Sequence, residues 1–328
     1  MADDQGVAAL PDTVEVLRAF NGSVVYLVGT AHFSDASQED VAKVINAVQP
    51  DCVVLELCKG RQTMLTIDES TIANMPAITL SGLKGYIKKL GFVQGIFYQL
   101  MISISSSISR DLGMLPGGEF RRAVIEAKKY DCIISLGDRP VDVTIKRVIS
   151  MLSWVKCIKL MINLLTTPDI KITKEDVEKF KDTDLLAALM IEMAADYPEL
   201  REVIVDERDK YLTYNLQKSA GFVIESNGDL TNLTPNFGPQ VVVGIVGLGH
   251  IAGIKNYWQT ISKNDVLEIA KIPPQSRSSK IIKIVIKVSS CCLLIWGVSK
   301  IPGVKPLSKM AYNAVTTGHV QGQFTRIL

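Results

Sequence analysis

The chain has 328 residues, of which 47% are hydrophobic, and its mean hydropathy is slightly positive at +0.22. This length fits one large domain or two modest ones, and the apolar content is ample for a buried core. The formal net charge is only +2, which argues against a nucleic-acid-binding protein. The six cysteines show no Cys-x-x-Cys spacing, which favours a reducing compartment over secretion.

The first β-α unit begins after an expected N-terminal tail, residues 1–19, which shows no signal peptide. An apolar run over 24–28 predicts a strand that ends in Gly29-Thr30-Ala31-His32. Ser37-Gln38-Glu39-Asp40 matches a capping box, and apolar residues at helical spacing after it predict a helix that ends at Pro50.

A second buried strand is predicted at Cys52–Leu55, and Glu56 follows it directly. The pattern then becomes irregular and helical over about 64–115. Within it, the apolar and serine-rich stretch Gly91–Ser109 is long enough to resemble a membrane segment. Its serines and the Arg110-Asp111 pair that follows favour a helical subdomain or lid instead.

A further buried strand is predicted over Cys132–Leu136, and it ends in Gly137-Asp138-Arg139-Pro140. Helices are expected over 141–220, where Glu207 and Arg208 fall on a stripe of apolar residues. Charges on a buried stripe must be paired or must serve a site.

The last strand, Val241–Val246, is followed by Gly247-Leu248-Gly249-His250 and an amphipathic helix. The alternating units predict an α/β fold with a central, mostly parallel sheet and helices on both faces. This domain is expected to cover residues 20–270, with helical insertions at about 64–115 and 141–220, and a C-terminal apolar helical segment beyond it.

A linker is expected at 271–280, followed by a hydrophobic, membrane-associated region at 281–328. Within it, Ile281–Val298 is strongly apolar but is interrupted by Lys283 and Lys287. The uninterrupted stretch is shorter than the ~20 residues that a spanning helix needs, unless both lysines snorkel to one interface. Three alternatives stay open, namely a tail anchor, an interfacial helix and a buried helix.

Polar residues follow the predicted strands at the edge where open α/β sheets assemble sites: His32, Glu56, Asp138, Arg139 and His250. Two of the three histidines in the chain stand in matching Gly-x-x-His turns. Two imidazoles and a carboxylate are typical ligands of zinc, manganese or cobalt. Another carboxylate could accept a proton from bound water, and an arginine could stabilise an oxyanion.

Purely structural interpretations of the same residues stay open. Glu56 could accept helix N-terminal amides, and Asp138-Arg139 could form an ion pair within a turn. Residues 247–252 also match G-x-G-x-x-A, a dinucleotide-binding pattern, with Glu268 near the expected acidic position. Too little chain follows Glu268 to complete such a domain, so this alternative is disfavoured. The glycines Gly29, Gly247 and Gly249 are expected to let the chain turn sharply at the site.

Five motifs taken together resemble the TraB domain family, which includes the bacterial TraB/PrgY proteins and belongs to a wider group with Tiki, erythromycin esterase-like and ChaN-like proteins. The resemblance covers about residues 20–265. The motifs are Val28–His32, Val53–Cys58 with Arg61, Pro116–Phe120, Leu136–Pro140 and Val246–His250.

The resemblance implies a metal-dependent hydrolase that acts on a peptide or protein. His32 and His250 would be metal ligands, Glu56 a ligand or general base, and Glu119, Asp138 and Arg139 would line the site. It also implies attachment to a cytosol-facing membrane, in particular the mitochondrial outer membrane, through the C-terminal region. The alternatives are a non-catalytic membrane adaptor or contact-site protein with a TraB fold, and a haem-binding protein with a histidine ligand. The sequence does not indicate an oligomeric state.

Overall fold

The computed structural model describes residues 10–67, 80–166, 197–233 and 238–273. The chain divides into two units, residues 1–274 and 275–328, and all the described residues belong to the first. The predicted membrane-associated region therefore lies outside the described residues, as does His319.

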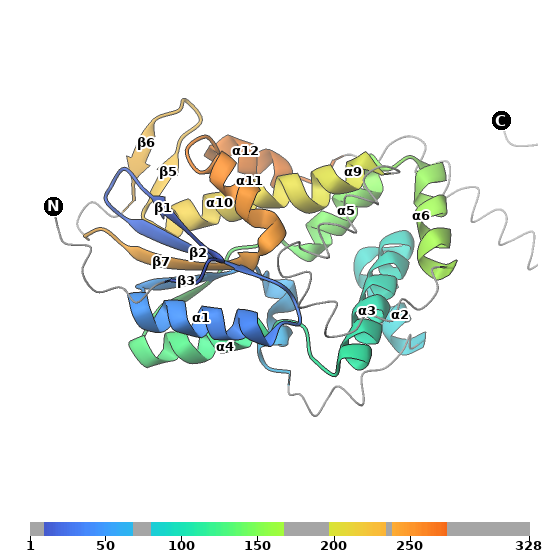
Figure 1. Cartoon of the computed structure of the whole chain (residues 1–328). Coiled ribbons are helices and arrows are strands. Elements are labelled where there is room, and N and C mark those ends of the chain that lie inside the picture. Colours follow the sequence, from blue (N-terminus) through green and yellow to red (C-terminus); the bar gives the residue numbers. More distant parts are fainter. Residues whose placement is uncertain (1–9, 68–79, 167–196, 234–237, 274–328) are drawn as a thin grey trace, which may run out of the picture. The chain divides into compact units, whose positions relative to one another are not determined.

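A five-stranded sheet forms the centre of the first unit (Figure 1). Its spatial order is β1-β2-β7-β3-β4, with β1 antiparallel to β2 and the remaining neighbours parallel. The last strand in the sequence therefore lies between the two strands that the sequence predicts first. The strands are β1 Val14–Arg18, β2 Val24–Thr30, β3 Cys52–Leu55, β4 Ile133–Leu136 and β7 Val241–Gly247.

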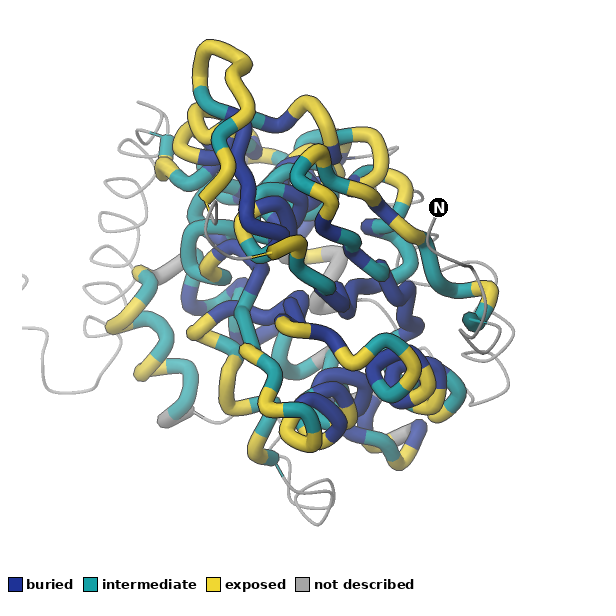
Figure 2. The backbone as a smooth tube through the Cα atoms, turned by 90° about the vertical axis from the view of Figure 1, so that its left-hand side faces the viewer, coloured by how far each residue is buried: buried dark blue, intermediate teal, exposed yellow. Residues whose placement is uncertain are grey.

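Helices cover both faces of the sheet, which confirms the predicted α/β fold (Figure 1). On one side lie α1 (Asp35–Val48) and α4 (Gly118–Ala127). On the other lie α10 (Glu207–Ser219) and α11 (Leu248–Tyr257), with α12 (Lys263–Ala270) packed on α10. Figure 2 colours each residue by its burial and shows buried residues in the interior, with exposed residues mainly on the outer turns of the helices and in loops.

The apolar strand sequences are explained by burial on both faces. In β2, Val25 and Leu27 belong to the cluster under α10 and α11, whereas Val28 belongs to the cluster under α1 and α4. Residues in β3 and β7 alternate between the same two clusters. Because the side chains on both faces of these strands pack against apolar side chains of the helices, the strands have no polar face.

Further helices form a third apolar cluster around Phe97, Val148 and Leu200, beside the sheet. The predicted stretch Gly91–Ser109 lies mostly in α3, as expected for a helical subdomain. Among the described residues, no helix combines the length and apolarity that crossing a membrane requires. The elements here are α2 Leu80–Leu90, α3 Phe92–Leu112, α5 Val141–Met151, α6 Trp154–Thr166, α9 Pro198–Arg201 and a π-helical segment, η4, Glu202–Asp206.

The smaller elements complete the described part of the chain. Two 3-10 helices, η1 and η3, follow β3 and α4, and β5 pairs with β6 in an antiparallel hairpin beyond α10. Their bounds are η1 Lys59–Leu65, η3 Lys128–Tyr130, β5 Phe222–Ile224 and β6 Leu230–Asn232.

Three details of the sequence prediction were wrong. The expected N-terminal tail contains β1, which forms the sheet edge beside β2. Helix α1 begins at Asp35 because the Ser34 side chain, not that of Ser37, caps it by accepting from the Ser37 backbone N–H. Strand β4 is an edge strand rather than a buried one, and Ile133 is 69% exposed.

Candidate functional site

The two Gly-x-x-His turns meet because β2 and β7 are neighbouring parallel strands, with Thr30 opposite Gly247 in the register. His32 lies in the loop after β2, and His250 lies in the first turn of α11. A side chain on Gly247 would meet Glu56 Oε2 at 3.4 Å, His32 Nε2 at 3.7 Å and His250 Cδ2 at 3.8 Å. Both imidazoles and one carboxylate therefore surround the end of β7.

Each imidazole is oriented by a buried carboxylate on its Nδ1 side. His32 Nδ1 lies 2.8 Å from Glu119 Oε1, and His250 Nδ1 lies 2.5 Å from Asp209 Oδ1. An ionised carboxylate can only accept, so the imidazole Nδ1–H donates in both pairs. In a neutral imidazole the Nε2 lone pair then lies on the opposite edge of the ring. On that edge, His250 Nε2 lies 3.3 Å from Glu56 Oε1.

Glu56, directly after β3, uses both carboxylate oxygens. Oε2 accepts from the Gly247 backbone N–H at 2.7 Å, and Oε1 contacts Arg208 as well as His250. Burial alone would raise the pKa of Glu56, but the charges of His250 and Arg208 outweigh it and hold this pKa well below its ordinary value. Glu56 therefore stays a carboxylate.

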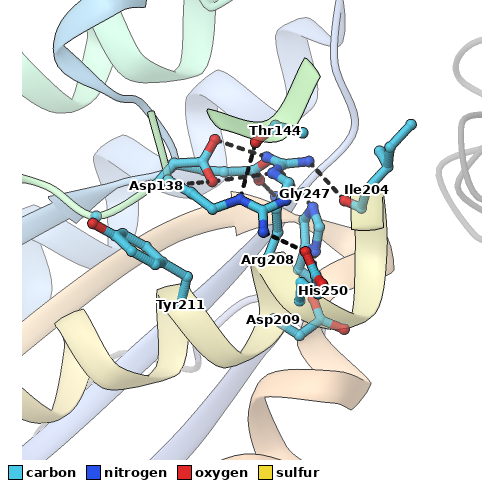
Figure 3. A network of polar contacts seen from close by, with 12 residues as sticks. Asp138, Thr144, Ile204, Arg208, Asp209, Tyr211, Gly247 and His250 are labelled. Carbon is cyan, nitrogen blue, oxygen red and sulfur yellow. Dashed lines mark hydrogen bonds and ion pairs between the residues drawn. The ribbon is translucent and has the colours of Figure 1, made fainter. Parts of the chain in front are cut away.

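Arg208 on α10 joins Glu56 to Asp138, which follows β4. Figure 3 shows Arg208 beside Asp138. Its Nε and Nη2 donate to the two oxygens of Asp138 at 3.0 and 3.1 Å. Its Nη1 donates to the Ile204 carbonyl at 3.3 Å, within η4. Asp138 also accepts from Arg61, a residue of η1. The Arg208 side chain is only 11% exposed, so its charge is neutralised by these buried acids rather than by water.

Arg139 is not part of this arrangement. Its side chain is fully buried and donates to Glu207, to Thr144 Oγ1 at 3.0 Å and to the carbonyls of Val203 and Ile269 at 2.7 and 3.2 Å. Glu207 is bound on its other side by Arg147. Arg139 therefore joins α5, η4, α10 and α12, whereas Arg208 occupies the place that the sequence assigned to Arg139.

Close packing explains one of the predicted glycines. A Cβ on Gly29 would lie 2.5 Å from Leu248 Cδ2 and 3.3 Å from Ile251 Cγ1, so a side chain there would require these residues of α11 to shift. Gly247 contributes its N–H to Glu56, and Gly249 lies in the first turn of α11 beside His250.

Sequence reasoning missed Arg208 and Asp209 as site residues, although Arg208 carries a signal. Three consecutive charged residues, Glu207-Arg208-Asp209, are all largely buried. Glu207 is 4% exposed and Asp209 3%, and the side chain of Arg208 is 11% exposed. The sequence places Arg208 with Glu207 on an apolar stripe, and a charge buried there requires a partner or a site. The π-helical turn η4 immediately precedes this run, and such turns occur frequently at functional sites.

The sequence profile of the TraB/PrgY/gumN family matches residues 16–267, which include every side chain of this site. The chain belongs to the TraB/PrgY/gumN family. It is 42% identical over 290 residues to TraB domain-containing proteins of Mus musculus and Homo sapiens, an alignment that covers 87% of this chain and 75% of each relative. It is also 27% identical over 273 residues to an uncharacterized protein of Methanocaldococcus jannaschii, covering 81% of this chain and 62% of that relative.

The described conformation does not bring three metal-ligating side chains onto one point: no cluster of three or more His, Cys, Asp or Glu suited to an ion occurs in the described ranges. Two donors, His250 Nε2 and Glu56 Oε1, are separated by 3.3 Å. That is about the spacing of adjacent ligands in a tetrahedral site with bonds of ~2 Å. His32 Nε2 faces the same space beside Gly247.

The side chains linked by these contacts carry an excess of negative charge. Four of them are carboxylates (Glu56, Glu119, Asp138 and Asp209), and two are guanidiniums (Arg61 and Arg208). Two negative charges remain when both imidazoles are neutral. In the metal-free protein, protonation of His250 offsets part of this excess, because its contact with Glu56 outweighs the effect of burial and raises its pKa to about 9.

Proposed function

We propose that this TraB-family site binds a divalent transition-metal ion, zinc, manganese or cobalt, and that the protein is a metal-dependent hydrolase. The observation that carries the proposal is the pair of imidazoles, each held at Nδ1 by a buried carboxylate. Metal-binding histidines are usually oriented in this way. The excess of two negative charges supports a divalent cation as the ligand.

The donor set proposed is His32, His250 and Glu56. Between the two roles considered for Glu56, ligand and general base, its lowered pKa supports the ligand, because a weakly basic carboxylate is a poor proton acceptor. Glu119 is engaged at His32 Nδ1, so it orients that imidazole instead of facing the reacting water. Arg208 and Asp138 keep Glu56 ionised and in place.

A bound ion would supply Lewis acidity and lower the pKa of a coordinated water toward neutrality. The chain's own contribution is to hold the two imidazoles and Glu56 around the end of β7, where Glu56 is 3% and His250 8% exposed and the His32 side chain is 32% exposed. The class of substrate, a peptide or protein, rests on the family resemblance alone.

The test is the metal content of purified protein and its affinity for added Zn²⁺, Mn²⁺ and Co²⁺. We expect about one ion per chain in the wild type and its loss when His32→Ala and His250→Ala are combined. His319→Ala is the matched control because it changes the one remaining histidine. Equal metal content in all three folded proteins would overturn the proposal, and a Soret absorption band would favour haem as the ligand instead.

We also propose that the apolar segment Ile281–Val298 attaches the protein to a cytosol-facing membrane, the mitochondrial outer membrane in particular. We expect deletion of residues 281–328 to move the protein to the soluble fraction. A chain that ends at Val298 keeps the apolar segment and is expected to sediment with membranes. If the chain that lacks residues 281–328 also sediments with membranes, the attachment lies elsewhere.

A further inference from the structure

Asp209 reaches His250 across a contact between two helices, α10 and α11, at which one helix has no side chain. Gly253 lies three residues after His250, on the same face of α11. A Cβ built on Gly253 would lie 1.9 Å from Asp209 Oδ2, 2.5 Å from its Cγ and 2.9 Å from its Cβ. The Asp209 carboxyl group therefore occupies the volume that the Cβ of any other residue at position 253 would fill.

The carboxylate is confined at both oxygens. Oδ1 lies 2.5 Å from His250 Nδ1, and Oδ2 lies against the backbone of Gly253. Asp209 is 3% exposed, so water offers it little alternative solvation. Since the atoms in conflict include Cβ and Cγ, rotation of the carboxyl group cannot relieve a clash, and a side chain at Gly253 must displace Asp209 or separate the helices.

We propose that Gly253 and Asp209 act together as positioning residues for His250. Gly253 admits the Asp209 carboxylate to its place, and Asp209 fixes the orientation of the imidazole and keeps the proton on Nδ1. The Nε2 edge of the ring is thereby directed at Glu56 beside Gly247. The effect on the imidazole stands by itself, whereas the effect on metal affinity rests on the proposed function.

The experiment observes the imidazole groups directly by ¹H–¹⁵N NMR of metal-free protein labelled with ¹⁵N-histidine. With three histidines in the chain, each ring is assigned from its own substitution. In the wild type we expect protected, downfield Nδ1–H signals from His250 and His32, as their contacts with carboxylates require. Gly253→Ala and Asp209→Asn should each shift the His250 signal upfield and speed its exchange, with the His32 signal unchanged as an internal reference.

Gly85→Ala is the matched control, because Gly85 is also in a helix but a Cβ there would meet nothing within 4 Å. It should leave both imidazole signals in place. Asp209→Asn introduces no clash, so it decides the question if Gly253→Ala fails to fold. An unchanged His250 signal in Asp209→Asn, or in folded Gly253→Ala, would overturn the proposal.

A second measurement separates this inference from the proposed function. If the site binds Co²⁺, Gly253→Ala and Asp209→Asn should lower the affinity about 10–100-fold, the range typical for loss of a group that orients a histidine ligand. If the wild type binds no metal, the proposed function fails while the NMR result still decides the role of Gly253 and Asp209.

Discussion

Replacement of Arg208 by leucine is expected to destabilise the folded domain by about 3–5 kcal/mol, the usual cost of removing one partner of a buried ion pair. Arg208 is the link between Glu56 and Asp138, and its side chain is 11% exposed. Without it, Asp138 retains Arg61, and Glu56 retains His250 and the Gly247 amide but loses its guanidinium partner. A buried carboxylate that loses its guanidinium must be protonated or hydrated, and either change costs free energy.

Urea unfolding of the metal-free protein at pH 7 measures this effect as a change in the free energy of unfolding. Arg122→Leu is the matched control, because Arg122 is 47% exposed and pairs with Glu126 within one helix. Helix pairs spaced i, i+4 contribute about 0.3–0.5 kcal/mol, and Glu126, which is 1% exposed, retains Lys129 and Asn46 as partners. Arg208→Lys preserves the charge but not the paired N–H donors, so an intermediate loss is expected. If Arg208→Leu costs no more than Arg122→Leu, the interpretation of Arg208 as the central cation of the site is wrong.

The ends of the strands could be predicted from the sequence, because a strand that is buried on both faces consists of a continuous run of apolar residues. His32, Glu56 and His250 each follow such a run, Asp138 follows the apolar edge strand β4, and the structure brings all four to the carboxyl ends of the strands. The order of the strands could not be read in the same way. That His32 and His250 meet depends on β7 entering between β2 and β3, a long-range pairing with no local signal.

The roles of the arginines were not predictable from strand ends. Arg139 adjoins Asp138 in the sequence, but its side chain turns toward Glu207 and the carbonyls of Val203 and Ile269. Arg208 and Asp209 come from helix α10, which directly follows the π-helical turn η4. A helical wheel assumes a regular α-helix and does not include a π-helical turn. It therefore indicates that Arg208 is buried but does not indicate its partners.

Metal-free protein is expected to lose about 3 kcal/mol of stability between pH 6.5 and 9 through His250. The imidazole has an ordinary pKa of 6.5, and in the folded protein its contact with the Glu56 carboxylate raises the pKa to about 9, although burial opposes this. The folded state therefore binds the proton more tightly than the unfolded state. The stabilisation is fully present below pH 6.5 and is lost as the pH rises through 9.

The free energy of unfolding is measured in urea with a chelator at several pH values between 6 and 9. The control combines His250→Gln with Asp209→Asn, which replaces the charged pair by two amides, and its stability should change much less over this range. Added Mn²⁺ should reverse the trend between pH 6.5 and 8, because an ion bound at His250 Nε2 competes with the proton and gains affinity as the pH rises. A wild type whose pH profile parallels that of the double variant would show that His250 is not held as an imidazolium by Glu56. A trend that Mn²⁺ leaves unchanged would keep the ion pair but count against a metal at this position.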